Sequence, residues 1–497
     1  MTQEKPPDSV VQMQNAAARG AGWAIILGMG ARILSLVGSI VITYFINPDV
    51  MGEVGVAVIV VETVTAFTTF GQGHYMLSRP HEGPATMWHI TVSHVGLGVL
   101  TLAATVLLQG PLATWMNSPT LGKYLPWMAL AALLDRVAFV PERLLSRALR
   151  FRRVAVTRSA AELMYGVSSL TLAALGMGGM AVVLGNVARS SLRFLSYVSS
   201  SPRTEWLVPY RLSMAKYREI FAFGVPLALG GWVGMAAAKW DNLIIARLYG
   251  PELMGQYNVA YNLADVPADQ IGEQAGEILL PSLARLQPKD RPQLAIFSMG
   301  MLAFIIFPVS VGLGMVATTA AHTLLRSNWG AVGPMLAVLS VLSIARPMAW
   351  QMGAYLQASG RTHVLLVLSI AKLALLVLLM FTLGRLGPLW ACVAVGLAFI
   401  AHALALQTVV AIWEHVSFRA LLGRCVRPLL ACIPLGLAVL GAREALRAAG
   451  LDVRGVGLTV EVIAGVVGYV VGAWVFARHQ TKEFLTLVRE ARKKRDA

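Results

Sequence analysis

The sequence predicts an all-α membrane protein with fourteen transmembrane helices, of which the first twelve form two copies of a six-helix lobe. Three observations lead to this prediction: an apolar composition, a series of long apolar segments, and a motif that occurs twice. Hydrophobic residues make up 57% of the 497 positions, charged residues make up 13%, and the mean hydropathy is +0.66. A soluble chain of this length would need a more highly charged surface, so a soluble globular protein is excluded.

The apolar segments are long enough to cross a bilayer, whose hydrocarbon core of roughly 30 Å requires about 20 residues per helix. They are predicted at residues 20–46, 50–77, 86–112, 121–146, 154–176, 178–200, 219–249, 252–284, 293–318, 332–358, 362–385, 387–412, 424–446 and 456–477. The loops and termini predicted on the same side of the membrane as the N-terminus, with the helix ends next to them, contain 27 Lys and Arg residues. Those on the opposite side contain seven. Because cytoplasmic loops hold the excess of these residues, both termini are predicted to be cytoplasmic.

One motif of eleven residues occurs twice, at 47–57 and again at 250–260. Its Pro, Met, Gly, Val and Ala positions are identical in the two copies, and each copy links two long apolar segments. Duplicated helical halves are typical of alternating-access transporters, in which the substrate site lies between the repeats. The motif therefore predicts a transporter.

The repeat extends into the helices that follow each motif. The offset of 203 residues aligns Glu62 with Asp265, and an offset of 210 aligns Arg136 with Arg346. Helices 1–6 and 7–12 are therefore predicted to be related by a pseudo-twofold axis along the membrane normal, with helices 13 and 14 outside the repeat. The predicted parts are an N-terminal lobe at 1–200, a cytoplasmic linker at 201–218, a C-terminal lobe at 219–412, helices 13 and 14 at 413–477, and a basic cytoplasmic tail at 478–497.

The net charge of +16 comes mainly from loops and from the tail. Such clusters next to membrane spans indicate contact with anionic lipid headgroups, so membrane lipids are expected partners and nucleic acid is not. The chain contains no P-loop, no Gly-x-Ser-x-Gly sequence and no spacing typical of metal ligands. We therefore expect neither an enzyme nor a metal site.

Charged side chains inside the predicted spans are candidate functional groups, because each costs roughly 2.5–3.5 kcal/mol at the bilayer centre. The cations are Arg32, Arg136, Arg189, Arg193, Lys239, Arg346 and Lys372; the anions near mid-helix are Glu62, Asp135, Glu162, Asp241, Asp265 and Asp269. The set as a whole predicts a water-filled cavity, although any single pair can serve only to hold helices together. Asp135 and Arg136 point about 100° apart on their helix, so each requires a partner elsewhere.

Several stretches resemble the helix 7–8 region of the Wzx-like flippases, which are polysaccharide transporters of the multidrug/oligosaccharidyl-lipid/polysaccharide (MOP) superfamily. These stretches are Phe223–Leu227, Trp240–Gly250, Met254–Tyr261, Asp265–Pro267 and Leu280–Leu286. The predicted helix count and the two six-helix lobes also match this family. The resemblance therefore covers most of the chain.

The resemblance implies a multi-pass protein of the bacterial inner membrane that translocates undecaprenyl-diphosphate-linked oligosaccharides for exopolysaccharide, capsule or O-antigen synthesis. A polysaccharide polymerase and a chain-length regulator are the partners it suggests. No cofactor is implied beyond coupling to H⁺ or Na⁺. The substrate-binding cavity would contain Arg32, Lys239, Arg346, Arg136, Arg189 and Lys372; the coupling or charge-balancing residues would be Glu62, Asp241, Asp265 and Asp269.

Two alternatives differ from this interpretation in the chemistry that they require. A multidrug cation antiporter of the same superfamily would need a mainly acidic cavity, whereas seven cations lie within the predicted spans here. A membrane glycosyltransferase, polymerase or acyltransferase would need an acid/base motif and a larger external loop. The sequence provides neither of these.

Overall fold

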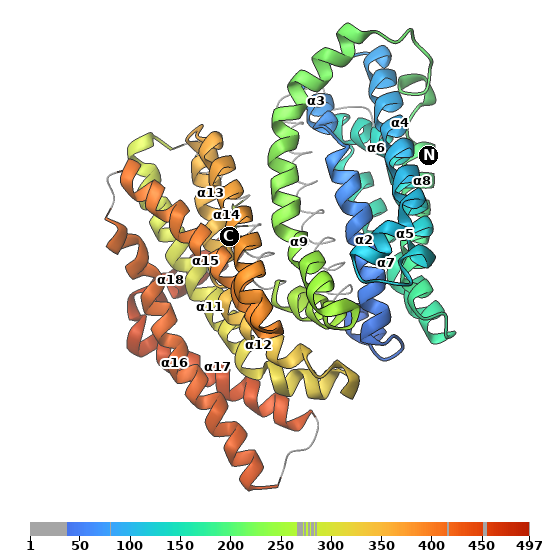
Figure 1. Cartoon of the computed structure of the whole chain (residues 1–497). Helices are drawn as coiled ribbons and strands as arrows, with labels where there is room; N and C mark the ends of the chain where they lie inside the picture. Colours follow the sequence, from blue (N-terminus) through green and yellow to red (C-terminus); the bar gives the residue numbers. More distant parts are fainter. Residues whose placement is uncertain are drawn as a thin grey trace. The chain divides into compact units, whose positions relative to one another are not determined.

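The computed structural model describes residues 37–79, 81–265, 286–414, 417–450 and 455–496, together with Gly272, Ala275, Gly276, Leu279 and Leu283. The described residues are helical apart from short turns and loops, and they form two compact units, residues 1–255 and 256–497 (Figure 1). Ten helices in these ranges are long and apolar enough to cross a membrane. The protein is therefore an all-α, multi-pass membrane protein.

The helices of the first unit extend from residue 48 to the motif at 250–260. They are α2 Pro48–Phe67, α3 Gln72–Ser78, α4 Pro84–Leu107, α5 Gln109–Trp115, α6 Leu121–Arg147, α7 Phe151–Ala174, α8 Gly179–Ser200, the 3₁₀ turn η1 Arg203–Glu205, and α9 Met214–Asp265, of which the residues from 256 onward belong to the second unit. The long helix α9 is interrupted at Gly250, whose φ of 84° and ψ of 174° are not helical. The interruption separates the predicted helices 7 and 8, and it lies at the start of the second copy of the motif.

The second unit contains the remaining helices. They are η3 Pro288–Asp290, α11 Arg291–Leu324, η4 Ser327–Trp329, α12 Val332–Leu342, α13 Ala345–Ala358, α14 Thr362–Thr382, η5 Leu383–Leu386, α15 Pro388–Trp413, α16 Phe418–Ala448, α17 Val456–Phe476 and α18 Arg478–Asp496. The predicted span 332–358 is thus divided into α12 and α13. The division lies just before Pro347, whose ring does not fit a helix interior.

The predicted set of fourteen spans is recovered in part. Helices α7 and α8 occupy the predicted segments 154–176 and 178–200, although they are not among the ten helices that are long and apolar enough to cross a membrane. Most of the first predicted span, and most of the part of the eighth beyond Asp265, lie outside the described residues. The fourteen-helix count and the cytoplasmic position of both termini remain predictions.

The second predicted span, 50–77, is shorter in the structure because α2 ends at Phe67 and the short helix α3 follows. Gly71 adopts a φ of 62°, in the left-handed region that glycine populates readily. A Cβ atom at Gly71 would lie 2.4 Å from the carbonyl oxygen of Gly224, so α9 passes directly against this turn. This contact between distant parts of the chain, which local hydropathy does not report, explains the break.

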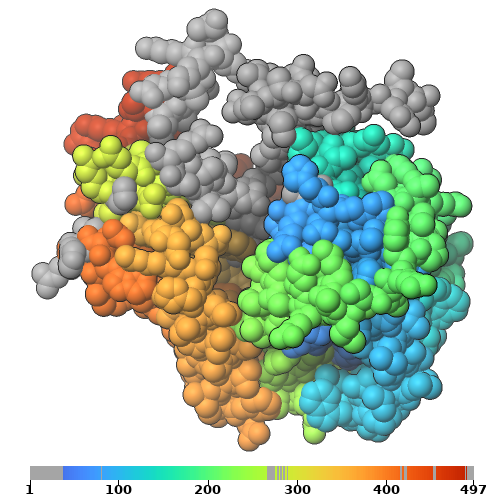
Figure 2. Space-filling view, turned by 90° about the horizontal axis from the view of Figure 1, so that it is seen from above, coloured from blue at the N-terminus to red at the C-terminus, as the bar shows by residue number. Residues whose placement is uncertain are grey.

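The first part of α9 packs along α2. Trp232 Nε1 donates a hydrogen bond to the carbonyl oxygen of Ala66 over 2.9 Å, and the Trp232 ring lies 5.2 Å from that of Phe67. Figure 1 shows the green α9 running beside the blue α2, and Figure 2 shows green atoms packed against blue atoms at the end where α9 begins. The segment predicted to open the C-terminal lobe therefore belongs to the first compact unit. The two lobes were predicted from repeated sequence and not from packing. The division of the chain into these lobes remains a prediction.

The two copies of the repeated motif contact each other through their glycines. A Cβ atom at Gly52 would lie 1.7 Å from the carbonyl oxygen of Pro251, and a Cβ atom at Gly255 would lie 2.1 Å from that of Pro48. The contact is reciprocal, because the Pro of each copy meets the Gly of the other. Small residues allow helix backbones to approach this closely inside membranes. The shared Pro and Gly positions therefore have a packing function.

Charged side chains connect the loop before α4 to the start of α9. Lys216 Nζ lies 3.0 Å from Oε2 of Glu82 and 3.0 Å from Oε2 of Glu219, to which the hydroxyl of Tyr75 donates over 2.8 Å. Burial raises the pKa of Glu82, but the hydrogen bonds from Thr86 and Lys216 outweigh burial and lower the pKa below its ordinary value of 4.5.

A pH dependence of stability follows from this depressed pKa. The stabilisation that Glu82 provides is complete above about pH 4.5, its ordinary pKa, and is lost as the pH falls through the lower pKa of the folded protein. We expect Glu82→Gln to lower the thermal unfolding midpoint near neutral pH and to have a smaller effect in acid. The control is Glu444→Gln, since Glu444 is 70% exposed. An equal effect of Glu82→Gln at all pH values would contradict the expectation.

Candidate functional site

A charged cavity of about 310 Å³ lies within the first unit, between α2, α4, α6 and α8. Three of the predicted site residues, Glu62, Arg136 and Arg189, line it. The other lining residues are Val58, Val61, Thr65, Thr69, His94, Met128, Ala131, Ala132, Asp135, Phe139, Glu142, Asn186, Ser190 and Arg193. The cavity therefore concentrates polar and charged groups inside a bundle of apolar helices.

Arg136, on α6, is 2% exposed and binds groups that carry no charge. Its guanidinium donates to the carbonyl oxygens of Thr65 at 2.7 Å, Thr68 at 3.3 Å and His94 at 3.4 Å, and to the hydroxyl of Thr68. Its Nε atom is buried without a hydrogen-bond partner, and no carboxylate of the described residues forms an ion pair with it. The positive charge of Arg136 is therefore not neutralised within the described part of the protein.

The other charged groups on the cavity wall have partners of opposite charge. Asp135 lies 3.1 Å from Arg193 and accepts a hydrogen bond from Ser190 over 2.9 Å. Arg193 also lies 3.4 Å from Glu142, which forms a second ion pair with Arg158 of α7.

Two further pairs complete the set. Arg189 lies 3.7 Å from Glu162, and Glu62 lies 3.6 Å from Lys239 on α9. The side chains of Glu62 and Lys239 are 46% and 44% exposed, so this pair can separate at low cost. Among the described charges that line the cavity, Arg136 is the one without an oppositely charged partner.

In the second unit, Arg346 forms the corresponding cluster. Arg346 is 5% exposed on α13, forms an ion pair with Asp265 and donates a hydrogen bond to the hydroxyl of Tyr261. Its guanidinium lies 4.0 Å from the ring centroid of Phe399, and Lys372 Nζ lies 4.8 Å from the same ring. Arg346 and Lys372 thus share one aromatic ring as a cation–π partner.

The two clusters agree with the sequence repeat and differ in one respect. Each arginine reaches the second helix of its own half, α2 for Arg136 and α9 for Arg346. Arg346 takes the carboxylate of Asp265, whereas Arg136 takes carbonyl groups. Glu62, which the repeat aligns with Asp265, pairs with Lys239 and not with Arg136. The first unit therefore keeps a cation available where the second unit has an ion pair.

The remaining predicted residues lie elsewhere. Asp241 is 1% exposed and accepts a hydrogen bond from its neighbour Asn242 over 3.1 Å. Arg32 and Asp269 lie outside the described residues. The structure thus brings Glu62, Arg136, Arg189 and Lys239 together in the first unit and Asp265, Arg346 and Lys372 together in the second.

Two cavity residues, Asp135 and Arg193, were named as candidate charges in the predicted spans but not as cavity or coupling residues, and three more, Glu142, Asn186 and Ser190, were not singled out. Helical spacing provides a signal that could have identified some of them. Asp135 and Glu142 are seven residues apart and face the same side of α6, and Arg189 and Arg193 are four apart on α8.

Comparison with known proteins relates the chain to polysaccharide transporters. The family model described as polysaccharide biosynthesis protein matches residues 41–334. The lipopolysaccharide biosynthesis protein WzxC of Escherichia coli K12 is 22% identical over 356 residues, which are 71% of this chain and 72% of WzxC. The succinoglycan biosynthesis transport protein ExoT of Rhizobium meliloti is 25% identical over 334 residues, 65% of each chain.

Solved structures share the fold. The lipid II flippase MurJ in its inward closed conformation aligns with a TM-score of 0.77 at 13% identity, covering 92% of this chain and 99% of MurJ. An inward-facing multidrug transporter of the MATE family aligns with a TM-score of 0.62 at 16% identity, covering 79% of this chain and 95% of that chain. Among these similar proteins, ExoT is named as a transport protein and MurJ as a flippase. The chain belongs to the polysaccharide biosynthesis protein family, the Wzx-like transporters of the MOP superfamily.

Proposed function

We propose that the protein is a flippase that moves undecaprenyl-diphosphate-linked oligosaccharide units from the cytoplasmic to the periplasmic leaflet of the inner membrane, for surface polysaccharide synthesis. The observation that carries the proposal is the charge of Arg136, which is buried at a polar cavity and has no carboxylate partner among the described residues. WzxC and ExoT, the relatives described above, are named for lipopolysaccharide and succinoglycan biosynthesis. A transporter for such pathways needs to hold a lipid-linked, negatively charged glycan.

The cavity suits the diphosphate better than the glycan. At about 30 Å³ per molecule of liquid water, a volume of 310 Å³ corresponds to about ten water molecules. That space accommodates a diphosphate and its nearest sugar, and the rest of an oligosaccharide must extend beyond it. An arginine forms strong charge-assisted hydrogen bonds with phosphate oxygens, so Arg136 is the proposed contact. Asn186 and Ser190 already donate to Val182 and Asp135, so their side-chain oxygens are left to accept hydrogen bonds from sugar hydroxyls.

The pair Glu62–Lys239 is proposed to couple substrate binding to an ion. An arriving diphosphate attracts Lys239, whose 3.6 Å contact with Glu62 is long and half exposed. Once released from Lys239, Glu62 can take up H⁺ or bind Na⁺, which offsets one negative charge of the arriving diphosphate. A multidrug cation antiporter would need the opposite arrangement, with an unpaired carboxylate in place of Arg136.

The test is deletion of the gene followed by analysis of the lipid extract. We expect an undecaprenyl-diphosphate oligosaccharide to accumulate, and we expect the wild-type gene to clear it. Lys239→Ala should clear it about tenfold more slowly, the size expected for loss of one charge-assisted contact. The matched control is Lys123→Ala, because Lys123 is an exposed lysine outside the cavity. Unchanged lipids and unchanged surface polysaccharide in the deletion strain would rule out the proposed function.

A further inference from the structure

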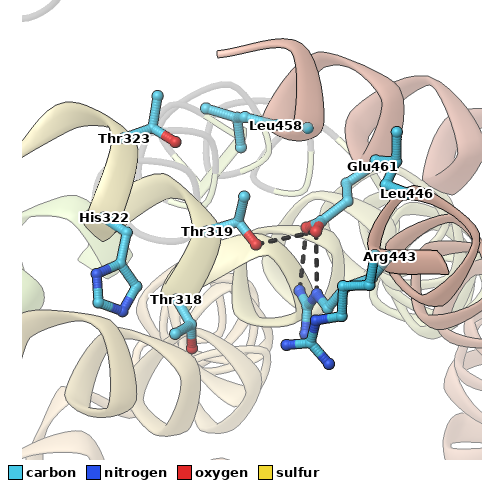
Figure 3. A pocket seen from close by; sticks show the side chains of 10 residues that line it. Thr318, Thr319, His322, Thr323, Arg443, Leu446, Leu458 and Glu461 are labelled. Carbon is cyan, nitrogen blue, oxygen red and sulfur yellow. Dashed lines mark hydrogen bonds and ion pairs between the residues drawn. The ribbon is translucent and has the colours of Figure 1, made fainter. Parts of the chain in front are cut away.

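A second cavity, of about 430 Å³, lies in the second unit where the ends of α11 and α16 meet the start of α17. Its lining residues are Thr318, Thr319, His322, Thr323, Arg443, Leu446, Arg447, Gly457, Leu458 and Glu461 (Figure 3). Helices α16 and α17 correspond to the predicted helices 13 and 14, which stand outside the repeat. The proposed transport function assigns no role to this cavity.

One wall of the cavity is held in place by an ion pair. Glu461 is 2% exposed, and Arg443 donates to both of its carboxylate oxygens over 2.9 and 3.0 Å. Thr319 donates to Glu461 over 2.9 Å, and Arg443 also donates to the carbonyl oxygen of Met315 over 2.7 Å. Figure 3 shows Arg443 and Thr319 directed at Glu461 from different helices. These bonds connect α11, α16 and α17, so the cavity has a preformed shape.

The remaining polar groups of the cavity can change partners. Arg447 forms its ion pair with Glu444 at 2.7 Å, and their side chains are 60% and 70% exposed. An ion pair this exposed contributes little, so a ligand can compete for Arg447. His322 and the hydroxyl groups of Thr318 and Thr323 line the same space. An arginine beside several hydroxyl groups favours a ligand with negative charge and many oxygen acceptors, which describes a phosphate ester.

The surroundings of the cavity indicate that the phosphate ester belongs to a lipid. Large apolar side chains stand exposed on the helix that forms one wall, among them Val462, Ile463 and Val466 of α17, which are 45%, 59% and 60% exposed. Leu437 and Leu440 on α16 are 65% and 46% exposed. Such surfaces on membrane helices face acyl chains, and they begin within two turns of the polar cavity. The cavity therefore lies where acyl chains meet headgroups.

We propose that this cavity binds the phosphate group of a membrane phospholipid, with Arg447, Thr323 and His322 contacting the phosphate and the acyl chains lying along α16 and α17. The bound lipid would hold these two helices against α11, beside the ion pair of Arg443 and Glu461. This site is separate from the cavity around Arg136 and does not depend on the proposed transport function.

The test is titration of the purified full-length protein, in a neutral detergent, with dihexanoyl phosphatidylglycerol, followed by native mass spectrometry. Arg447→Gln should weaken binding of one lipid about tenfold, and Thr323→Val should weaken it a few-fold. The control is Arg385→Gln, an exposed arginine of the same unit outside the cavity, which should bind as the wild type does. Thermal unfolding of each variant checks that the fold is retained.

Two further ligands test the source of the phosphate. Dihexanoylglycerol, which has the same chains and no phosphate, should bind at least about tenfold more weakly to the wild type. Inorganic phosphate at equal concentration should not displace the lipid. The proposal is overturned if Arg447→Gln and Thr323→Val both bind as the wild type does, if dihexanoylglycerol binds as tightly, or if inorganic phosphate displaces the lipid.

Discussion

Replacement of Gly255 by alanine is expected to destabilise the first unit severely. The new methyl group would lie 2.1 Å from the carbonyl oxygen of Pro48 and 2.9 Å from the backbone nitrogen of Gly52, well inside van der Waals contact. Backbone atoms cannot move aside as a flexible side chain can, so α2 and α9 would have to separate. Overpacking of this kind typically costs about 1–3 kcal/mol, and a backbone clash falls at the upper end or beyond.

The measurement is the amount of monodisperse protein recovered in detergent and its thermal unfolding midpoint. The matched control is Gly230→Ala, in the part of α9 before the interruption at Gly250, where nothing lies within 4 Å of the added methyl group. That control should be neutral or slightly stabilising, because alanine favours the helix more than glycine does. Gly52→Ala should reproduce the defect, since its methyl group would lie 1.7 Å from the carbonyl oxygen of Pro251. Equal midpoints for Gly255→Ala and Gly230→Ala would refute the close contact.

Replacement of Arg136 by glutamine is expected to reduce flipping of the lipid-linked glycan at least about tenfold, the effect of removing one buried charge-assisted interaction. Arg136 also ties α2 and α4 to α6 through the carbonyl groups of Thr65 and His94. A loss of transport could therefore arise from a loss of packing. The decisive readout compares flipping in vesicles with the thermal unfolding midpoint for the same set of variants.

Arg136→Lys separates the two explanations. Lysine keeps the positive charge but forms fewer of the hydrogen bonds to the backbone, so it should lower stability while retaining part of the transport activity. Arg189→Gln serves as the control at the same cavity, because Arg189 already pairs with Glu162 and should matter less. If Arg136→Lys and Arg136→Gln lose transport to the same extent, in proportion to their loss of stability, the role of Arg136 is packing alone.

The repeat allowed much of the arrangement to be predicted from the sequence. Identical Pro and Gly positions at equal offsets indicated two copies of one turn, and in the structure each glycine meets the proline of the other copy. The alignment of Arg136 with Arg346 also has a structural counterpart, since each arginine contacts the second helix of its half. These features are visible in sequence because duplication preserves residue type at equivalent positions.

The partners of individual charges could not be predicted in the same way. Alignment of Glu62 with Asp265 suggests that Glu62 should meet Arg136, but Lys239 of α9 takes Glu62 instead. This choice depends on how α9 packs along α2, which the hydropathy of neither helix specifies. The early end of α2 at Phe67 has the same cause, since it depends on the approach of Gly224 to Gly71.

The reciprocal contact between the two motif copies has a consequence for the origin of the chain. A surface on which residue i meets residue j and residue j meets residue i is isologous, as in a twofold-symmetric homodimer. A half-length chain with a single Pro-x-x-x-Gly turn would therefore already present both sides of this interface to a second copy of itself. Gene fusion would then need to supply only the connection, because such a dimer would already contain the contact. Each glycine remains constrained by a backbone oxygen from the opposite copy.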